Sequence, residues 1–191
     1  HSLDRRQRQM CIRDSFIKTA QHPPLNDAVS AQHFQTLVNA TAKAGFTHYE
    51  VCSFGKPGYF SRHNSSYWLG NPYLGVGPSA HSFDGKKRSW NVSNNKKYIN
   101  TIAKNELPLT SELLTLENRF NEYIMTGLRT IWGISLKRIE EEFGLGVQKN
   151  LLNNAHCYLV SETLKIENAH LKMTPKGQFL SDGIASDLFI V

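Results

Sequence analysis

The 191-residue sequence lacks the features that mark several specialised classes of protein. No run of about 18 apolar residues occurs, so we expect no transmembrane helix. The three cysteines, Cys11, Cys52 and Cys157, are far apart and odd in number. This argues against a disulfide framework and predicts a reducing, cytoplasmic location. No two of them have metal-ligand spacing, so no zinc or iron–sulfur site is expected within this chain.

Residues 1–14 differ from everything after them. They show no hydrophobic periodicity, and residues 5–14 resemble translated sequencing-adapter sequence. We therefore expect residues 1–14 to be a foreign leader and the native start of the protein to be missing. The predicted fold therefore begins at residue 15.

Residues 15–110 have the pattern of mixed helix and strand. A helix is predicted from Asn26 or Asp27 to about Ala44, where Gly45 ends it. Strands are predicted over residues 47–53, within residues 73–83 and over residues 88–92. A loop rich in turn-forming residues separates the first two strands.

Residues 111–191 are predicted to form a mostly helical module. Helices are expected over residues 111–131, 134–143, 147–160 and 174–185, with a hairpin of residues 164–166 and 171–173 before the last. The first helix has an apolar stripe of Phe120, Ile124, Gly127, Leu128 and Ile131. Helices followed by a hairpin and a final helix indicate a winged-helix-like module.

The residues with the most distinctive chemistry lie in the predicted loop after the first strand. They are Lys56, Arg62, His63, Asn64, Tyr67 and Trp68. A neutral imidazole is a good axial ligand for haem iron, and Tyr and Trp offer flat faces to a macrocycle. Lys56 and Arg62, or the basic cluster at residues 86–88, can pair with porphyrin propionates. A histidine in a polar loop can equally be structural, bonded to a nearby carbonyl, so both interpretations stay open.

Two further features allow two interpretations each. Gly75 and Gly77 permit close backbone approach to a ligand at the carboxyl end of a barrel strand, but a tight turn explains them as well. Glu50 is either a carboxylate at a barrel mouth or the partner of a nearby arginine.

Residues 48–59, 62–64, 67–68 and 73–83 together resemble the coproporphyrinogen-III-oxidase-like radical SAM family. The His-Asn-x-x-Tyr-Trp pattern of residues 63–68 is similar to that of its haem-chaperone branch, the HemW branch. The resemblance implies an α/β fold. Residues 15–110 would be the carboxy-terminal part of a partial TIM-like β/α barrel, and residues 111–191 a mostly helical, winged-helix-like domain.

The resemblance also implies roles for individual residues. His63 would bind haem iron, and Asn64, Tyr67 and Trp68 would shape the haem site. Gly75, Gly77 and Ala80 would border the S-adenosylmethionine site of the barrel. The family holds a [4Fe–4S] cluster with a Cys-x-x-x-Cys-x-x-Cys triplet, which this sequence lacks. We therefore expect the cluster and S-adenosylmethionine in the intact parent, and no radical chemistry from this chain alone.

Three functions remain, in order of preference. The first is a haem-binding chaperone acting in porphyrin and haem metabolism, with haem and haem-accepting proteins as partners. The second is an oxygen-independent coproporphyrinogen III oxidase, so whether the parent is an enzyme stays open.

The third is a nucleic-acid-binding winged helix. The formal charge of +6 is local, because residues 132–191 hold six basic and seven acidic side chains. A duplex reader needs several Lys or Arg against phosphates, so no nucleic-acid partner is expected. A peripheral membrane contact is left open. A partial barrel exposes strand edges, so poor solubility is expected.

Overall fold

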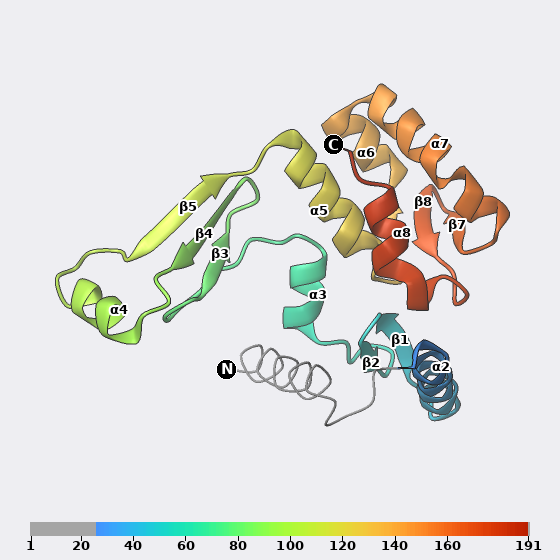
Figure 1. Ribbon diagram of the computed structural model, residues 1–191, viewed down its shortest axis with the longest axis horizontal. Coiled ribbons are helices and arrows are strands. Elements are labelled where there is room, and N and C mark those ends of the chain that lie inside the picture. The colour runs from blue at the N-terminus through green and yellow to red at the C-terminus, as the bar shows by residue number, and fades with distance from the viewer. Residues whose placement is uncertain (1–25, 191) are drawn as a thin grey trace. The chain divides into compact units, whose positions relative to one another are not determined.

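The computed structural model describes residues 26–190 (Figure 1). The predicted leader lies outside the described residues. The chain divides into two compact units, His1–Ala40 and Thr41–Val191. Most of helix α2 (Asp27–Lys43) belongs to the first. It begins where predicted, because the side-chain oxygen of Asn26 accepts a hydrogen bond from the amide of Val29 at 3.2 Å.

The second unit opens with a hairpin where one strand was predicted. Strands β1 (Thr47–Glu50) and β2 (Ser53–Gly55) pair antiparallel, with His48 opposite Phe54. The chain turns at Val51 and Cys52, so the prediction of a continuous strand over residues 47–53 is wrong. The reversal places Glu50 and Ser53 opposite each other at the end of the hairpin.

A three-stranded antiparallel sheet follows. Its strands are β3 (His81–Phe83), β4 (Lys87–Asn91) and β5 (Leu109–Leu113), in the order β3-β4-β5. Helix α4 (Asn95–Ile102) lies between β4 and β5 in the chain. The predicted strand at residues 88–92 is confirmed as β4. All strand pairs among residues 26–190 are antiparallel, although α4 separates β4 from β5 and two helices and a strand separate β6 from β8.

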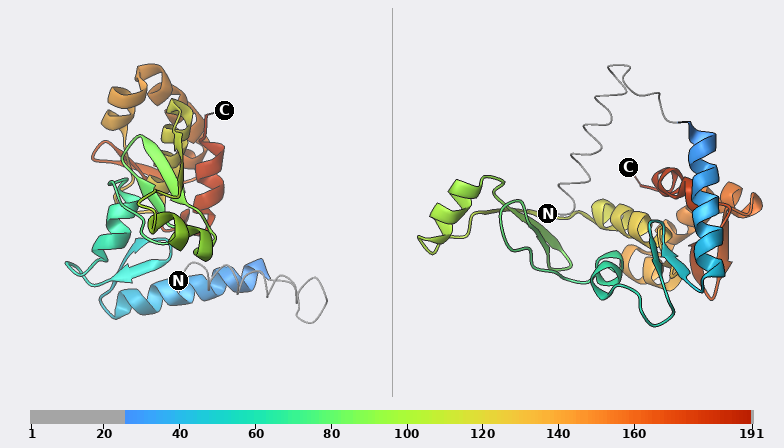
Figure 2. Two further views of the ribbon diagram at one scale, coloured as in Figure 1. Left: turned by 90° about the vertical axis from the view of Figure 1, so that its left-hand side faces the viewer. Right: turned by 90° about the horizontal axis from the view of Figure 1, so that it is seen from below.

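The remainder has the element order of a winged helix. The elements are α5 (Leu116–Leu128), β6 (Ile134–Ser135), α6 (Leu136–Phe143), α7 (Leu145–Val160), β7 (Leu164–Glu167), β8 (His170–Met173) and α8 (Ser181–Asp187). Strands β6, β8 and β7 form a second antiparallel sheet in that order. Helices α5 to α8 gather around it in all three views (Figures 1 and 2).

One apolar core holds this winged-helix-like part together. Phe120, Ile124 and Leu128 of α5 are fully buried, as their spacing predicted. They pack with buried side chains of β6, α6, α7, β8 and α8, among them Ile134, Ile139, Leu151, Leu171 and Ile184. Gly127 lies against Ile134 so closely that a Cβ would sit 2.9 Å from its side chain.

Two predictions at the ends of this core are wrong. Ile131 was expected on the apolar stripe but is 37% exposed, because α5 ends at Leu128 and the chain turns. The last helix was expected to begin at Thr174. The Thr174 hydroxyl instead donates to the Glu162 carbonyl at 2.7 Å, and a short 3-10 helix, Gln178–Leu180, precedes α8.

Candidate ligand-binding site

The segment predicted to bind haem is helical rather than a loop. Helix α3 spans Arg62–Trp68, and the hydroxyl of Ser61 caps it by accepting from the Asn64 amide at 3.3 Å. The chain leaves the helix at Gly70, which has a φ of +72°. Helical spacing puts residues four apart on one face, so the four predicted haem residues divide into two pairs.

The first pair, His63 and Tyr67, lies on the more exposed face of α3. Both side chains are exposed, Tyr67 by 48%. His63 makes no hydrogen bond, ion pair or ring contact with any described residue. The structural alternative for His63, a bond to a nearby carbonyl, is therefore absent from residues 26–190, and the imidazole is open to a ligand.

The second pair, Asn64 and Trp68, turns toward the rest of the unit. The side-chain amide of Asn64 donates to Ser53 Oγ at 3.5 Å. The Trp68 ring lies under the Arg129 guanidinium, whose central carbon is 5.2 Å from the ring centroid. The Trp68 indole N–H is buried and has no hydrogen-bond partner within residues 26–190.

Glu50 is the partner of an arginine, the second of its two predicted roles. Its residue is only 3% exposed, and Oε1 accepts from Arg129 at 3.1 Å. Oε2 accepts from the Ser53 hydroxyl at 2.7 Å and the Cys52 amide at 3.1 Å. Arg129 also pairs with Asp182 of α8 at 2.5 Å. Burial disfavours its charge, but Asp182 and Glu50 outweigh burial and raise the Arg129 pKa.

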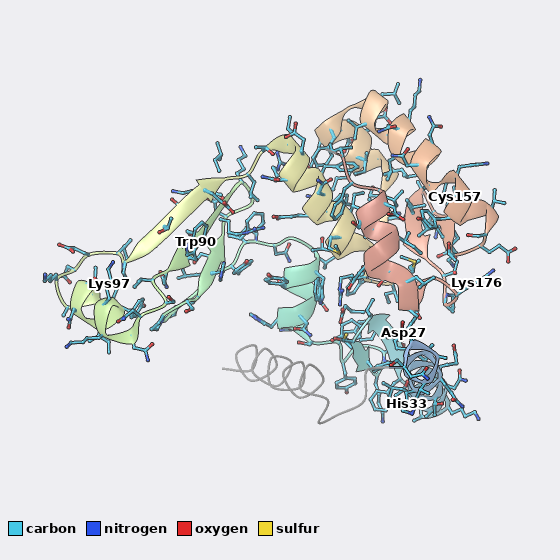
Figure 3. The ribbon with its side chains drawn as sticks, in the orientation of Figure 1. Asp27, His33, Trp90, Lys97, Cys157 and Lys176 are labelled. Atoms are coloured by element: carbon cyan, nitrogen blue, oxygen red, sulfur yellow. The ribbon has the colours of Figure 1, made fainter. Side chains whose placement is uncertain are left out.

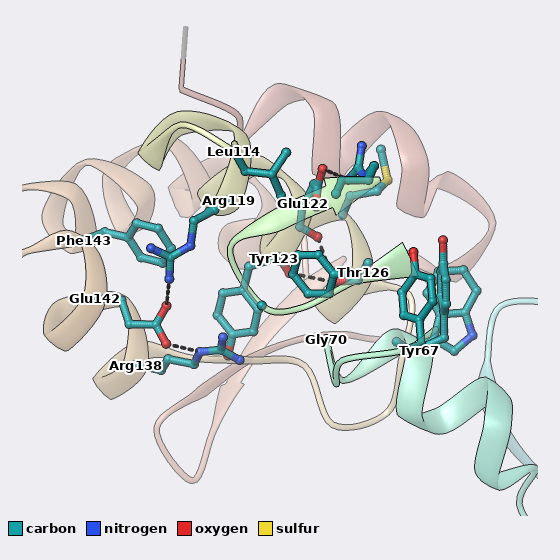
Figure 4. A pocket seen from close by; sticks show the side chains of 16 residues that line it. Tyr67, Gly70, Leu114, Arg119, Glu122, Tyr123, Thr126, Arg138, Glu142 and Phe143 are labelled. Carbon is teal, nitrogen blue, oxygen red and sulfur yellow. Dashed lines mark hydrogen bonds and ion pairs between the residues drawn. The ribbon is translucent and has the colours of Figure 1, made fainter. Parts of the chain in front are cut away.

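A cavity of about 420 Å³ opens beside α3 (Figure 4). Tyr67, Trp68 and Tyr73 form one aromatic wall, and α5 and α6 supply other lining side chains. Tyr73 is half-buried, with its ring 5.2 Å from that of Tyr67. Burial, followed by its hydrogen bond with Tyr67, raises the pKa of Tyr73 to about 12.

The structure brings together only part of the predicted site at this cavity. Tyr67 and Trp68 line it, whereas His63, Asn64, Lys56 and Arg62 do not. Lys56 lies instead over the ring of Phe46, 5.9 Å from its centroid, and Arg62 is exposed.

No sequence pattern singled out the cavity residues contributed by α5 and α6. They are Arg119, Glu122, Tyr123, Arg138 and Glu142. Their spacing, such as four residues between Arg138 and Glu142, is also typical of a solvated helix face, so periodicity alone does not select them.

The predicted S-adenosylmethionine segment is occupied by contacts within the chain. A Cβ on Gly75 would lie 2.1 Å from the carbonyl oxygen of His81, and Gly77 has a φ of +103°. The Asn91 side chain donates to the Gly77 carbonyl at 2.9 Å. These contacts are compatible with the turn that was the alternative interpretation, and the role of Gly75, Gly77 and Ala80 beside S-adenosylmethionine stays a prediction. Ala80 is flanked by residues that line a second cavity of about 740 Å³.

Residues 26–190 contain no cluster of three or more His, Cys, Asp or Glu side chains that could hold a metal ion. Cys52, in the turn between β1 and β2, and Cys157, on α7, are exposed free thiols (Figure 3). These residues therefore do not fit an iron–sulfur cluster. Among the described residues, no helix is long and apolar enough to cross a membrane.

Comparison with known proteins places these features in a family. The family model described as "HemN C-terminal domain" matches residues 114–180. "Heme chaperone HemW" of Bacillus subtilis is 34% identical over 115 residues, which are 60% of this chain and 30% of that protein. "Heme chaperone HemW" of Mycobacterium tuberculosis (strain H37Rv) is 30% identical over 164 residues, 85% of this chain and 40% of that protein.

A solved structure shares the fold. The radical SAM enzyme coproporphyrinogen III oxidase (HemN) of Escherichia coli superposes with a TM-score of 0.63 and 16% sequence identity. The match covers 81% of this chain and 39% of that one. The chain spans well under half the length of these relatives. The mixed α/β fold and the relatives agree that the chain is the carboxy-terminal part of a HemW/HemN-like radical SAM family protein.

Proposed function

We propose that this chain is part of a haem-binding chaperone of the HemW kind, and that α3 presents His63 as the ligand to haem iron. The supporting observation is the state of that imidazole: exposed, on a capped helix, and without a partner among the described residues. Tyr67 lies on the same face one turn later, where its ring can pack against a macrocycle.

Membership of the radical SAM family implies a [4Fe–4S] cluster and S-adenosylmethionine in the parent protein. The described residues supply no group of ligands for the cluster. The proposed role of this chain is therefore limited to binding haem and passing it to an accepting protein. The relatives matched over most of the chain are named as haem chaperones, which favours this function over coproporphyrinogen oxidation.

The test is a haem titration of the chain followed by absorption spectroscopy. The wild type is expected to give a ligand-shifted Soret band, and His63→Ala is expected to lose it. His156→Ala is the matched control, because His156 is an exposed histidine on α7, outside the proposed site. A Soret band that is unchanged in His63→Ala contradicts the ligand assignment. Conversion of coproporphyrinogen III by the parent protein would favour the oxidase instead.

A further inference from the structure

Two arginines in the cavity, Arg119 and Arg138, each donate a hydrogen bond to a different oxygen of the Glu142 carboxylate. Arg119 of α5 donates to Glu142 Oε2 at 3.0 Å, and Nε of Arg138 donates to Glu142 Oε1 at 2.7 Å. Figure 4 shows both guanidiniums turned toward that carboxylate. All three side chains line the cavity and are partly exposed. The geometry is therefore that of a carboxylate-binding clamp, open to solvent, with an internal carboxylate in place.

Aromatic rings fix both guanidiniums before any ligand arrives. Arg138 stacks on Tyr123, with its central carbon 4.3 Å from the ring centroid, and Arg119 lies 5.9 Å from that of Phe143. The Tyr123 hydroxyl accepts from the amide of Ser135 at 2.9 Å, which anchors the ring. Little side-chain entropy remains to be lost when a carboxylate binds.

The rest of the cavity suits a flat aromatic anion. A third guanidinium, Arg88, also lines it, and Glu122 is its partner there. The lining thus holds three arginines and two glutamates, and Arg88 also faces Glu112 outside the lining at 3.7 Å. The volume of about 420 Å³ is in the range of small-molecule sites, and Tyr67 and Tyr73 offer ring faces.

We propose that this cavity receives the propionate-bearing edge of a tetrapyrrole, with a ligand carboxylate replacing Glu142 between Arg119 and Arg138. This inference rests on the proposed function and adds the part of the ligand that the cavity recognises. His63 lies one helical turn from Tyr67 on the same face, so a macrocycle against Tyr67 extends toward the imidazole. The winged-helix-like part then supplies the carboxylate recognition that was predicted for Lys56 and Arg62.

The experiment uses metal-free protoporphyrin IX, whose binding does not depend on iron ligation by His63, and its dimethyl ester. Affinities for the chain are measured by porphyrin fluorescence anisotropy. The wild type is expected to bind the diacid about tenfold more tightly than the ester, because charge-assisted hydrogen bonds are lost on esterification. Arg138→Gln and Arg119→Gln are expected to abolish that preference while leaving ester binding unchanged. Arg138→Lys keeps the charge and is expected to retain part of the preference.

Glu142→Gln provides a test in the opposite direction. Removing the internal carboxylate is expected to tighten diacid binding several-fold and to leave the ester unaffected. A general loss of structure would instead weaken the binding of both the diacid and the ester. Lys137→Gln is the matched control, since Lys137 is the neighbour of Arg138 on α6 but pairs with exposed Glu141 outside the cavity.

The proposal is overturned if the wild type shows no preference for the diacid, or if the preference survives in Arg138→Gln. It is also overturned if Lys56→Gln or Arg62→Gln removes the preference instead. The haem titration with His63→Ala is independent of these results. A wild type that shows no diacid preference but keeps a His63-dependent Soret band contradicts only the cavity. A wild type with the diacid preference whose Soret band does not depend on His63 contradicts only the iron ligand.

Discussion

Arg129 is the residue through which α3, the β1–β2 hairpin and α8 meet. Its guanidinium contacts the Trp68 ring, the buried Glu50 carboxylate and Asp182. We expect Arg129→Met to lower the free energy of unfolding by about 3 kcal/mol, because it leaves the Glu50 carboxylate buried without its cation. Urea denaturation followed by circular dichroism measures this change.

The exposed pair Lys137–Glu141 is the control for that experiment. Its side chains are 79% and 62% exposed, and Lys137→Met is expected to change the free energy of unfolding by less than about 0.5 kcal/mol. If Arg129→Met and Lys137→Met changed the free energy of unfolding equally, the buried Arg129–Glu50 pair would be no more stabilising than an exposed ion pair.

Tyr73 is expected to make the stability of the folded chain depend on pH in the alkaline range. The tyrosine pKa is raised from 10.0 to about 12 by burial and by Tyr67, so the folded state favours the neutral phenol. The stability that neutral Tyr73 contributes is complete below pH 10 and is lost as the pH rises toward 12. Tyr73→Phe is therefore expected to lose less stability than the wild type between pH 9 and pH 11, by urea unfolding at each pH. If the wild type and Tyr73→Phe lost the same stability, another group would be responsible for the alkaline transition. Tyr158 would be the next candidate, because its hydrogen bond with Asp187 raises its pKa to about 12.

For single residues, the sequence indicated which side chains are of chemical interest but not which side chains they contact. Glu50 was recognised as a chemically interesting carboxylate, but its partner lies 79 residues away, and no local pattern connects them. Tyr67 and Trp68 were predicted to shape a haem site, and their contacts with Tyr73 and Arg129 depend on how α3 packs. A pairwise contact at long sequence separation follows from the fold and is not written in either residue's neighbourhood.

Among the elements, α3 departs most from the sequence prediction. Its seven residues include an asparagine and two serines, which favour turns over helix interiors, and so a loop was predicted. The helix forms because Ser61 caps it and because Trp68 packs under Arg129. Neither contact is evident from the sequence of so short a segment, because a helix of this length is not stable by its own propensity.

The cap of α3 is open to a direct test. Ser61→Ala is expected to destabilise the helix by about 1 kcal/mol, because the Asn64 amide loses its acceptor. Hydrogen exchange of the α3 amides, such as those of Ser65 and Leu69, should become faster. Ser61→Asp restores an acceptor and should restore protection, while α7 amides stay unchanged in both variants. Unaltered α3 exchange in Ser61→Ala would show that packing alone holds this helix.

The boundary between β5 and α5 shows a second limit of pattern recognition. Residues 111–115 were predicted to begin a long helix, but the chain pairs as β5 with β4 up to Leu113. Thr115 then caps α5 by accepting from the Asn118 amide at 3.1 Å. The stripe from Phe120 to Leu128 was predicted correctly, since those positions are buried on one face. The strand was missed because its pairing with β4 spans an intervening helix.

For the whole molecule, the winged-helix-like part was predictable because its helices and hairpin each have a complete local pattern. The apolar periods of α5, α6 and α7 all point into one core. The cavity was not predictable, because residues as distant as Tyr67 and Glu142 line it together. The family resemblance located the segment of interest, and the structure supplied the neighbours that define its chemistry.

Many winged-helix domains bind duplex DNA, but the charges of this winged-helix-like part argue against that function. The helix in the position that enters the major groove in duplex readers, α7, carries only one basic residue, Lys149. In the wing, Lys165 and Lys172 both pair with Glu167, at 2.8 and 2.9 Å. Their hydrogen bonds lower the Glu167 pKa to about 2, so that carboxylate stays ionised at ordinary pH and offsets one of the two lysine charges of the wing.

We therefore expect this part of the chain not to bind duplex DNA. Fluorescence anisotropy of a labelled duplex at 50 and 200 mM salt should show binding no tighter than about 10⁻⁵ M at the higher salt, the range of non-specific contacts. Weak binding through basic residues elsewhere in the chain would be unaffected by Lys149→Gln. Loss of affinity in Lys149→Gln, or gain in Glu167→Gln, would instead assign α7 or the wing to a nucleic-acid surface. The expected result would leave the cavity lined by α3, α5 and α6 as the proposed ligand surface of this part of the chain.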